Sequence, residues 1–194
     1  MTILKSPWTD DRGRKEQLDD HIQRSRTAYF GFQKVAAAEK QPRVARHFDA
    51  VARRYDLMNS LLSFGIHHAW KRTAVRMLGL APGAKVLDVC GGTADLAILA
   101  ARSAGPAGRV VVYDINRTMM SYGRPKAAAA RLENRIDFVQ GNAEALSFPD
   151  ARFDAAMVGF GIRNVTHMKR AFAEMHRVLK PGGKLVILEI SKPS

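Results

Sequence analysis

A pair of glycines stands where an apolar segment gives way to a predicted helix, and their setting indicates cofactor chemistry. Residues 85–89 read Lys-Val-Leu-Asp-Val, and one residue later come Gly91, Gly92 and Thr93. Glycines allow a tight turn and let a ligand approach the backbone closely. The first turn of a helix offers unpaired N–H groups and a partial positive charge. We therefore interpret Asp88, Gly91, Gly92 and Thr93 as part of a site for a nucleotide-like cofactor.

A second acid narrows the class of cofactor. Asp114 follows the apolar run 109–113, a position from which a carboxylate accepts hydrogen bonds from ribose hydroxyls. The glycine turn lacks the Gly-x-Gly-x-x-Gly pattern that accommodates a pyrophosphate, and the chain has no Gly-Lys-Ser/Thr phosphate loop. A nucleoside without phosphates suits such a turn, and S-adenosylmethionine (SAM) is the candidate. The alternative is an ordinary turn between a strand and a helix.

Short apolar runs alternate with helical stretches from Lys85 onward, which predicts an α/β fold with a doubly wound, mostly parallel sheet. The expected strands are 85–89, 109–113, 135–139, 153–158 and 183–190, and the expected helices lie near 94–103, 116–130 and 166–179. Ligands bind outside the carboxyl ends of such strands. Asn142 and Ala143 follow the third strand, and Gly159 to Asn164 follow the fourth. We expect these residues to gather with Asp88 and Asp114 at one sheet edge.

Three parts are predicted along the chain. Residues 1–28 are polar and form a flexible extension, residues 29–82 form a helical cap, and residues 83–194 form the cofactor-binding core, compact with the cap. Apolar side chains recur every three or four residues through the cap, at Val44, Phe48, Val51, Tyr55, Met58 and Leu62. This spacing predicts one face of a helix, followed after a break near Gly65 by a second helix from about His67 to Leu78.

Composition restricts the class of protein. The chain has 194 residues, of which 46% are hydrophobic, so one domain with a real core is expected, and no segment is apolar enough to cross a membrane. Its one cysteine, Cys90, leaves no disulfide framework and favours the cytoplasm. The net charge of +13 indicates either a solvated basic face or attraction to the inner face of an anionic membrane. No nucleic-acid motif and no metal-ligand pattern is present, so neither partner is expected.

Two longer blocks resemble the signature blocks of the ubiquinone/menaquinone biosynthesis C-methyltransferases. One runs from Tyr55 to Lys71 and the other from Arg177 to Ser191. The first is specific, whereas the Leu-Lys-Pro-Gly-Gly of the second recurs in many methyltransferases. Shorter similarities lie at 30–32, 142–146 and 160–165. The resemblance extends from about Tyr29 to the C-terminus and implies a Rossmann-like class I methyltransferase fold.

The resemblance also implies an activity. A methyl group would move from SAM to a ring carbon of a polyprenylated quinol precursor, with either a benzoquinol or a naphthoquinol ring. The residues that match cofactor contacts of the family are Thr93 near the methionine part, Asp114 at the ribose, and Asn142 and Ala143 beside the adenine. The position of Gly159 is commonly a serine that also contacts the cofactor.

Two departures from the family pattern bear on cofactor binding. Gly159 lacks the hydroxyl of the common serine, so that contact is lost. Ala94 replaces the last glycine of the turn, and an alanine is expected to fit there only if its φ stays negative. Both departures are expected to weaken cofactor binding.

A third departure concerns the C-terminal side of the core. Family members continue beyond the fifth strand with a segment that covers the substrate and with an antiparallel strand pair. We expect those strands to be absent here, which would leave residues 185–190 as an open apolar edge. Exposed edges of this kind pair with other chains. Poor activity, and either self-association as a homo-oligomer or a quinone-biosynthesis partner that supplies the edge, are therefore expected.

Methylation of a ring carbon needs alignment, exclusion of water and stabilisation of a phenolate. Arg163 follows the fourth strand and is the candidate for phenolate stabilisation or for acting through a water, with Asn164 orienting the ring. The alternative for Arg163 is a salt bridge from its loop to an acid. Tyr55 could cap the pocket, or it could pack in the core. His67 and Trp70 could line the acceptor site, or they could close the cap helices against the sheet.

Two other functions compete with a quinol methyltransferase. Ala94, Gly159 and the short C-terminal side favour a degenerate, non-catalytic scaffold in a quinone-biosynthesis assembly. The intact Asp88, Asp114 and Arg163 oppose it. The charge of +13 would suit a methyltransferase that acts on RNA or on a small molecule, but the specific block from Tyr55 to Lys71 argues against that.

Overall fold

The structure is a computed structural model that describes residues 27–30, 33–52, 58, 61 and 63–190. Almost all of the predicted extension, residues 1–28, lies outside these ranges, as do Tyr55 and residues 191–194. The division into extension, cap and core therefore stays a prediction. Within the described residues, no helix is long and apolar enough to cross a membrane.

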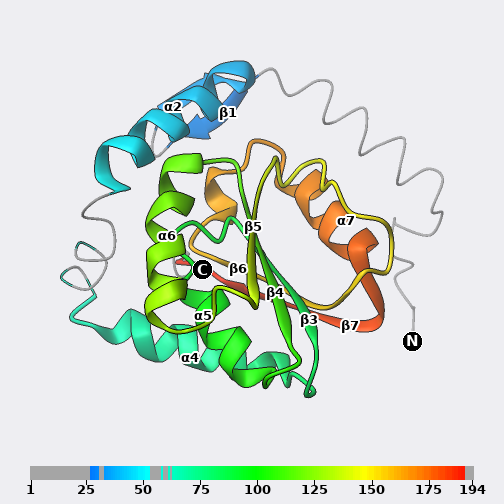
Figure 1. The fold of residues 1–194 in the computed structure, drawn as a ribbon. Coiled ribbons are helices and arrows are strands. Elements are labelled where there is room, and N and C mark those ends of the chain that lie inside the picture. Colours follow the sequence, from blue (N-terminus) through cyan, green and yellow to red (C-terminus); the bar gives the residue numbers. More distant parts are fainter. Residues whose placement is uncertain (1–26, 31–32, 53–57, 59–60, 62, 191–194) are drawn as a thin grey trace, which may run out of the picture.

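A five-stranded parallel sheet forms the centre of the fold (Figure 1). Its strands are β3 (Lys85–Val89), β4 (Arg109–Asp114), β5 (Ile136–Gln140), β6 (Phe153–Gly159) and β7 (Leu179–Leu188), in the spatial order β5-β4-β3-β6-β7. The predicted doubly wound sheet is confirmed. The fifth strand begins at Leu179 rather than at residue 183, and the pairing of β6 with β7 shifts register between Phe153 and Ala155.

Alternation along the strands separates two layers of core. On one face, side chains such as Val86, Val110 and Val112 pack with α4 (Ile66–Leu78), α5 (Asp95–Ser103) and α6 (Arg117–Ala129). On the other face, Leu87 and Val89 pack with α7 (Met168–Val178). Successive side chains of a strand point to opposite faces, so β3 feeds both cores.

The carboxyl ends of the strands are aligned, which is what brings the site together. Val89 of β3 pairs with Tyr113 of β4 and with Val158 of β6, and Asp114 pairs with Gln140 of β5. The loops that follow these strands therefore leave the sheet at one edge. The predicted gathering of the motifs at this edge is confirmed by the register.

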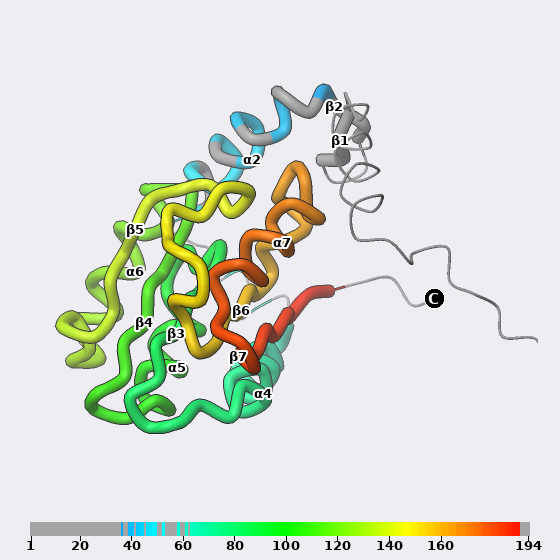
Figure 2. Tube along the Cα trace, turned by 90° about the vertical axis from the view of Figure 1, so that its right-hand side faces the viewer, coloured from blue at the N-terminus to red at the C-terminus, as the bar shows by residue number. Residues whose placement is uncertain are grey.

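The N-terminal part consists of a hairpin and a helix, and the helix lies over this edge. Strands β1 (Thr27–Phe30) and β2 (Gln33–Ala36) pair antiparallel and lead into α2 (Ala37–Val51). The hairpin was not predicted from the sequence. Figures 1 and 2 both show α2 at the top of the molecule and α4 at its bottom. The predicted second cap helix is confirmed as α4, which starts after a turn in which Phe64 and Gly65 both have positive φ.

Candidate active site

The turn between β3 and α5 depends on left-handed backbone conformations. Cys90, Gly92 and Ala94 have φ of 55°, 47° and 66°, and the N–H of Ala94 donates to the carbonyl of Gly91 over 2.8 Å. At Gly91 a Cβ would lie 2.8 Å from Cγ of Asp88, so a side chain does not fit there. The condition under which an alanine was expected to fit, a negative φ, is not met at Ala94. The turn imposes a positive φ on an alanine, a conformation that costs an L-residue roughly 1–2 kcal/mol.

Asp88 is directed beneath this turn because strand parity places it on the same face as Val86. Asp88 is fully buried, with 0% of its surface exposed. Burial raises the pKa of Asp88 to about 8, and the nearby charges of Asp114 and Asp95 act in the same direction. The backbone N–H of Ala97 opposes the shift. Asp88 is therefore held as a largely protonated carboxyl at neutral pH.

Asp114 ends β4 with its carboxylate held between two backbone N–H groups. One oxygen accepts from Gly92 over 2.9 Å and the other accepts from Asn116 over 2.8 Å. Burial raises the pKa of Asp114, although these N–H groups oppose the rise. Each oxygen still has a lone pair, so the carboxylate can accept two hydroxyl donors side by side. This is the geometry that a ribose diol requires.

Two lysines converge on the first residue of α5, a feature that the sequence analysis missed. Lys71 of α4 donates to Asp95 over 2.7 Å, and Lys126 of α6 forms a second, short ion pair with the same carboxylate. Burial raises the pKa of Asp95, but the two ammonium groups outweigh it and lower the pKa overall. A signal was available, because Lys71 falls on the buried face of α4 with His67 and Ala74.

The loop after β5 carries Asn142 and Ala143 and is fixed by side-chain oxygens that accept from backbone N–H groups. At Gly141 a Cβ would lie 2.0 Å from the Tyr113 hydroxyl, so the loop passes tightly over β4. The side-chain oxygen of Asn142 accepts from the N–H of Glu144 over 2.9 Å. Glu144 in turn accepts from the N–H groups of Thr166 and His167 at 3.1 Å each, at the start of α7.

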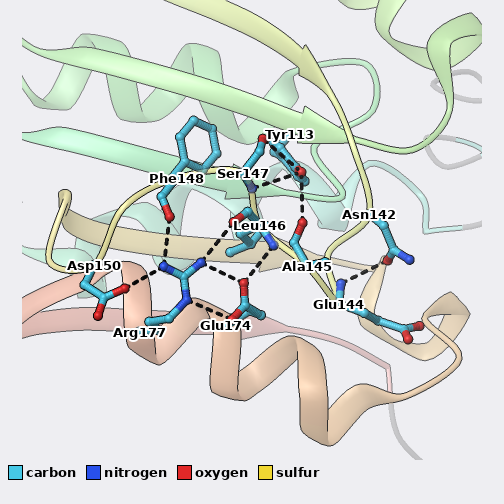
Figure 3. A network of polar contacts seen from close by, with 10 residues as sticks. All are labelled: Tyr113, Asn142, Glu144, Ala145, Leu146, Ser147, Phe148, Asp150, Glu174 and Arg177. Atoms are coloured by element: carbon cyan, nitrogen blue, oxygen red, sulfur yellow. Dashed lines mark hydrogen bonds and ion pairs between the residues drawn. The ribbon is translucent and has the colours of Figure 1, made fainter.

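Arg177 of α7 fastens the rest of this loop (Figure 3). Its guanidinium donates to the carbonyls of Leu146 and Phe148 over 2.9 Å and 2.8 Å. It also pairs with Glu174 and Asp150, each at 2.7 Å. Because Glu174 accepts from the N–H of Leu146 over 2.8 Å, loop and helix are joined in both directions.

Glycines after β6 let this segment lie against the glycine turn. A Cβ on Gly161 would lie 2.4 Å from Cβ of Cys90, and Phe160 between the two glycines has a φ of 58°. A Cβ on Gly159 would lie 2.5 Å from Cδ1 of Leu96. Leu96 therefore occupies the space that the serine expected at position 159 would need.

Helix α2 closes the cleft from above, and hydrogen bonds near both of its ends hold it to the core. Lys40 donates to the carbonyls of Arg163 and Val165 over 3.1 Å and 2.8 Å. Burial lowers the pKa of Lys40, and the charge of Glu144 opposes this. Nearer the other end, Asp49 accepts from the amide of Asn116 over 3.1 Å. The sequence analysis did not single out Lys40 or Asp49.

All eight residues predicted to bind the cofactor line one cleft, which contains about 1040 Å³ of empty space including its opening to solvent. They are Asp88, Gly91, Gly92, Thr93, Asp114, Asn142, Ala143 and Gly159. Val44 and Phe48 of α2 line it from above, and Lys71 and Asp95 line it as well.

The predicted catalytic residues are placed differently from one another. Asn164 lines the cleft. Arg163 does not, and its half-exposed guanidinium pairs with Glu189 of the segment after β7 over 2.5 Å. This is the salt bridge to an acid that was the alternative for Arg163. Tyr55 lies outside the described residues. Trp70 is exposed and His67 is buried, and neither lines the cleft.

Comparison with known proteins identifies the family. The profile of the ubiE/COQ5 methyltransferase family matches residues 35–194. The chain belongs to this family. It is 49% identical over 168 residues to the ubiquinone/menaquinone biosynthesis C-methyltransferase UbiE of Hahella chejuensis, covering 87% of this chain and 68% of the relative. It is 50% identical over 167 residues to the UbiE of Pasteurella multocida, covering 86% of this chain and 62% of the relative.

A solved structure has a similar fold. A putative methyltransferase from Bacillus halodurans superposes with a TM-score of 0.59 at 25% identity, covering 63% of this chain and 52% of that one. The predicted methyltransferase family and class I fold are thus confirmed. The chain spans about two thirds of the length of the UbiE relatives that it matches.

Proposed function

We propose that this chain binds SAM in the cleft and transfers its methyl group to a ring carbon of a polyprenylated quinol precursor, in ubiquinone or menaquinone biosynthesis. The single observation that carries the proposal is the placement of the Asp114 carboxylate beside the glycine turn, in a cleft lined by all the residues predicted to bind the cofactor. Membership of the ubiE/COQ5 family supports the choice of cofactor and acceptor.

The residues of the cleft fit the parts of SAM by their chemistry. Asp114 would accept hydrogen bonds from the two ribose hydroxyls through its remaining lone pairs. Thr93 and the N–H groups at the start of α5 would hold the methionine carboxylate. Asn142 and Ala143 would lie beside the adenine. When bound, SAM supplies a methyl group that is already activated on a sulfonium.

The protein's own contribution to transfer is then alignment and exclusion of water. Val44 and Phe48 from α2 and Leu96 from α5 give the cleft apolar walls. We propose that Asn164 orients the acceptor ring. We propose that Arg163, at the margin of the cleft, stabilises the phenolate that makes the ring carbon nucleophilic, in competition with Glu189. Tyr55 remains a candidate cap.

Calorimetry with SAM tests the binding step. Asp114→Ala should weaken binding by about 1.5–3 kcal/mol, the range for hydrogen bonds to a charged group. Unchanged affinity would remove Asp114 from the site.

A methylation assay with a demethylated quinol tests the transfer step. Arg163→Ala should slow turnover by about 100- to 1,000-fold at unchanged SAM affinity if the guanidinium stabilises the phenolate. Glu189→Gln is the matched control, because it breaks the ion pair and keeps the guanidinium. Normal turnover by both variants would make Arg163 a structural residue.

A non-catalytic scaffold is the second candidate, favoured by the strained Ala94 and by the Leu96 side chain packed against Gly159. A scaffold would bind SAM weakly or not at all and would not methylate a quinol. The same calorimetry on the unmutated chain therefore separates the two functions.

A further inference from the structure

The segment after β6 carries Asn164, the residue proposed to orient the acceptor ring, on a short 3-10 helix, η2 (Ile162–Asn164). The N–H of Asn164 donates to the carbonyl of Gly161 over 3.0 Å, and the N–H of Val165 donates to that of Ile162 over 3.1 Å. Asn164 and Val165 both line the cleft. The last carbonyls of a helical turn have no partner within that turn. The carbonyls at the end of η2 therefore need donors from another segment.

Lys40 of α2 supplies these donors. Its ammonium group donates to the carbonyl of Arg163 over 3.1 Å and to the carbonyl of Val165 over 2.8 Å. Only 5% of the surface of Lys40 is exposed, whereas a lysine is almost never so deeply buried unless it is paired. One buried side chain therefore ties α2 to the backbone on both sides of Asn164.

Glu144 holds the same segment through groups of the opposite polarity. Figure 3 shows it near Asn142 on the loop after β5, and its carboxylate accepts from the N–H groups of Thr166 and His167 at 3.1 Å each. Its charge also favours the charged form of Lys40, against the effect of burial on the Lys40 pKa. The backbone of residues 163–167 is thus fixed by a cation at its carbonyls and by an anion at its N–H groups.

Lys40 also shares a helix face with the apolar wall of the cleft. Val44 and Phe48 follow it at intervals of four residues, and residues four apart lie on the same face of a helix. Both of these apolar residues line the cleft. The two hydrogen bonds of Lys40 therefore determine where this wall lies relative to Asn164.

We propose that Lys40 is a positioning residue for methyl transfer, which holds Asn164 and the apolar wall of α2 in the relative placement that aligns the acceptor ring. Within the part of the chain that the structure describes, Lys40 is not among the residues that line the cleft, so it acts through these neighbours. The inference rests on the proposed function, because it assigns Lys40 a part in that reaction. A misplacement of about 1 Å in a site can lower the rate on the order of a hundredfold.

Methylation kinetics with a demethylated quinol test this role. Lys40→Met keeps an unbranched apolar side chain and removes the ammonium group. It should lower kcat by roughly ten- to hundredfold and leave the KM for SAM nearly unchanged. Lys40→Arg keeps the charge and the N–H donors, so it should recover a large part of kcat. Arg43→Met is the matched control, because it removes a positive charge from the same helix that pairs with Glu39 of α2, and its kcat should be normal.

Hydrogen exchange separates positioning from a general loss of stability. In Lys40→Met, the N–H groups of Asn164 and Val165 should exchange roughly five- to tenfold faster, while those of β3 and β4 keep their protection. This result together with a lower kcat supports the proposal. Normal kcat in Lys40→Met would overturn it. Faster exchange throughout β3 and β4 would also overturn it, because Lys40 would then stabilise the fold as a whole.

The unmutated chain keeps this inference distinct from the proposed function. If that chain binds no SAM in calorimetry and methylates no quinol, the proposed function is wrong, and the role of Lys40 in transfer is wrong with it. If that chain is active and Lys40→Met is equally active, the proposed function stands and only the positioning role is overturned.

Discussion

The amide of Asn116 donates a hydrogen bond to the carboxylate of Asp49, which joins helix α2 to the turn directly after Asp114. The same Asn116 accepts from the N–H of Met119 and so caps α6. One side chain therefore links the helix above the cleft, the candidate ribose-binding acid and the helix beside the glycine turn.

Asp49→Ala should loosen α2 without unfolding the core. The lost hydrogen bond is expected to contribute about 1 kcal/mol, since Asp49 is exposed to solvent. Hydrogen exchange in residues 37–51 should become faster, and SAM should dissociate faster. Glu39→Ala, which removes an exposed ion pair with Arg43 of the same helix, is the control and should change neither rate. Identical exchange in both variants would show that Asp49 does not hold α2.

Ala94→Gly should stabilise the protein, against the usual direction for a buried alanine. Ala94 has a φ of 66°, and glycine adopts this conformation without strain. We expect a gain of about 1 kcal/mol in the free energy of urea unfolding. Ala97→Gly, at an equally buried helical position three residues later, should instead destabilise by about 1 kcal/mol or more. If both variants lose stability, backbone strain at Ala94 does not lower the free energy of unfolding significantly.

Asp88 should make stability fall as pH rises. The folded protein keeps the Asp88 proton up to about pH 8, whereas the unfolded chain loses it near the ordinary aspartate pKa of 3.8. Unfolding thus releases a proton between these values, and stability declines by up to about 1.4 kcal/mol per pH unit. Asp88→Asn should flatten this decline, measured by urea unfolding between about pH 5 and about pH 8. Parallel curves for variant and parent would place the Asp88 pKa near normal. The raised pKa of Asp114 acts in the same direction and is present in both proteins.

Arg177→Ala should release the loop after β5. It removes hydrogen bonds to the carbonyls of Leu146 and Phe148 and the ion pairs with Glu174 and Asp150. We expect a loss of about 2–4 kcal/mol of stability and weaker SAM binding through Asn142 and Ala143. Arg177→Lys keeps the positive charge but not the several N–H donors of the planar guanidinium. It should therefore retain only part of the stability that Arg177→Ala loses. Full recovery by lysine would mean that charge alone holds the loop.

The positions of the cofactor-side residues could be predicted because each follows the end of a strand. Short apolar runs between helical stretches locate β3 and β4, and parallel register then places Asp88 and Asp114 at the same edge. No such rule predicts the direction of the Arg163 side chain, because a side chain in a loop can turn either toward Glu189 or toward the cleft. The prediction for Arg163 was therefore left with two alternatives, and the structure shows the ion pair.

The contacts of Lys40 and Lys71 were missed for a different reason. A lysine in a helix ordinarily faces solvent, and its acceptors here lie in distant segments. Both lysines do sit on apolar faces, Lys40 in line with Val44 and Phe48, and that spacing was the available signal. The hairpin β1–β2 has no turn motif as strong as Asn-Gly, and only its pairing shows it.

The hydrogen bond from Lys40 to the carbonyl of Val165 joins residues 125 positions apart, and this sets an order of assembly. Helix α2 is synthesised early, but its acceptors leave the ribosome only after nearly the whole core. At about 5–20 residues per second, this interval is on the order of 6–25 seconds. During it, Val44 and Phe48 have no cleft to cover. We infer that α2 docks only after strands β3 to β6 have been synthesised.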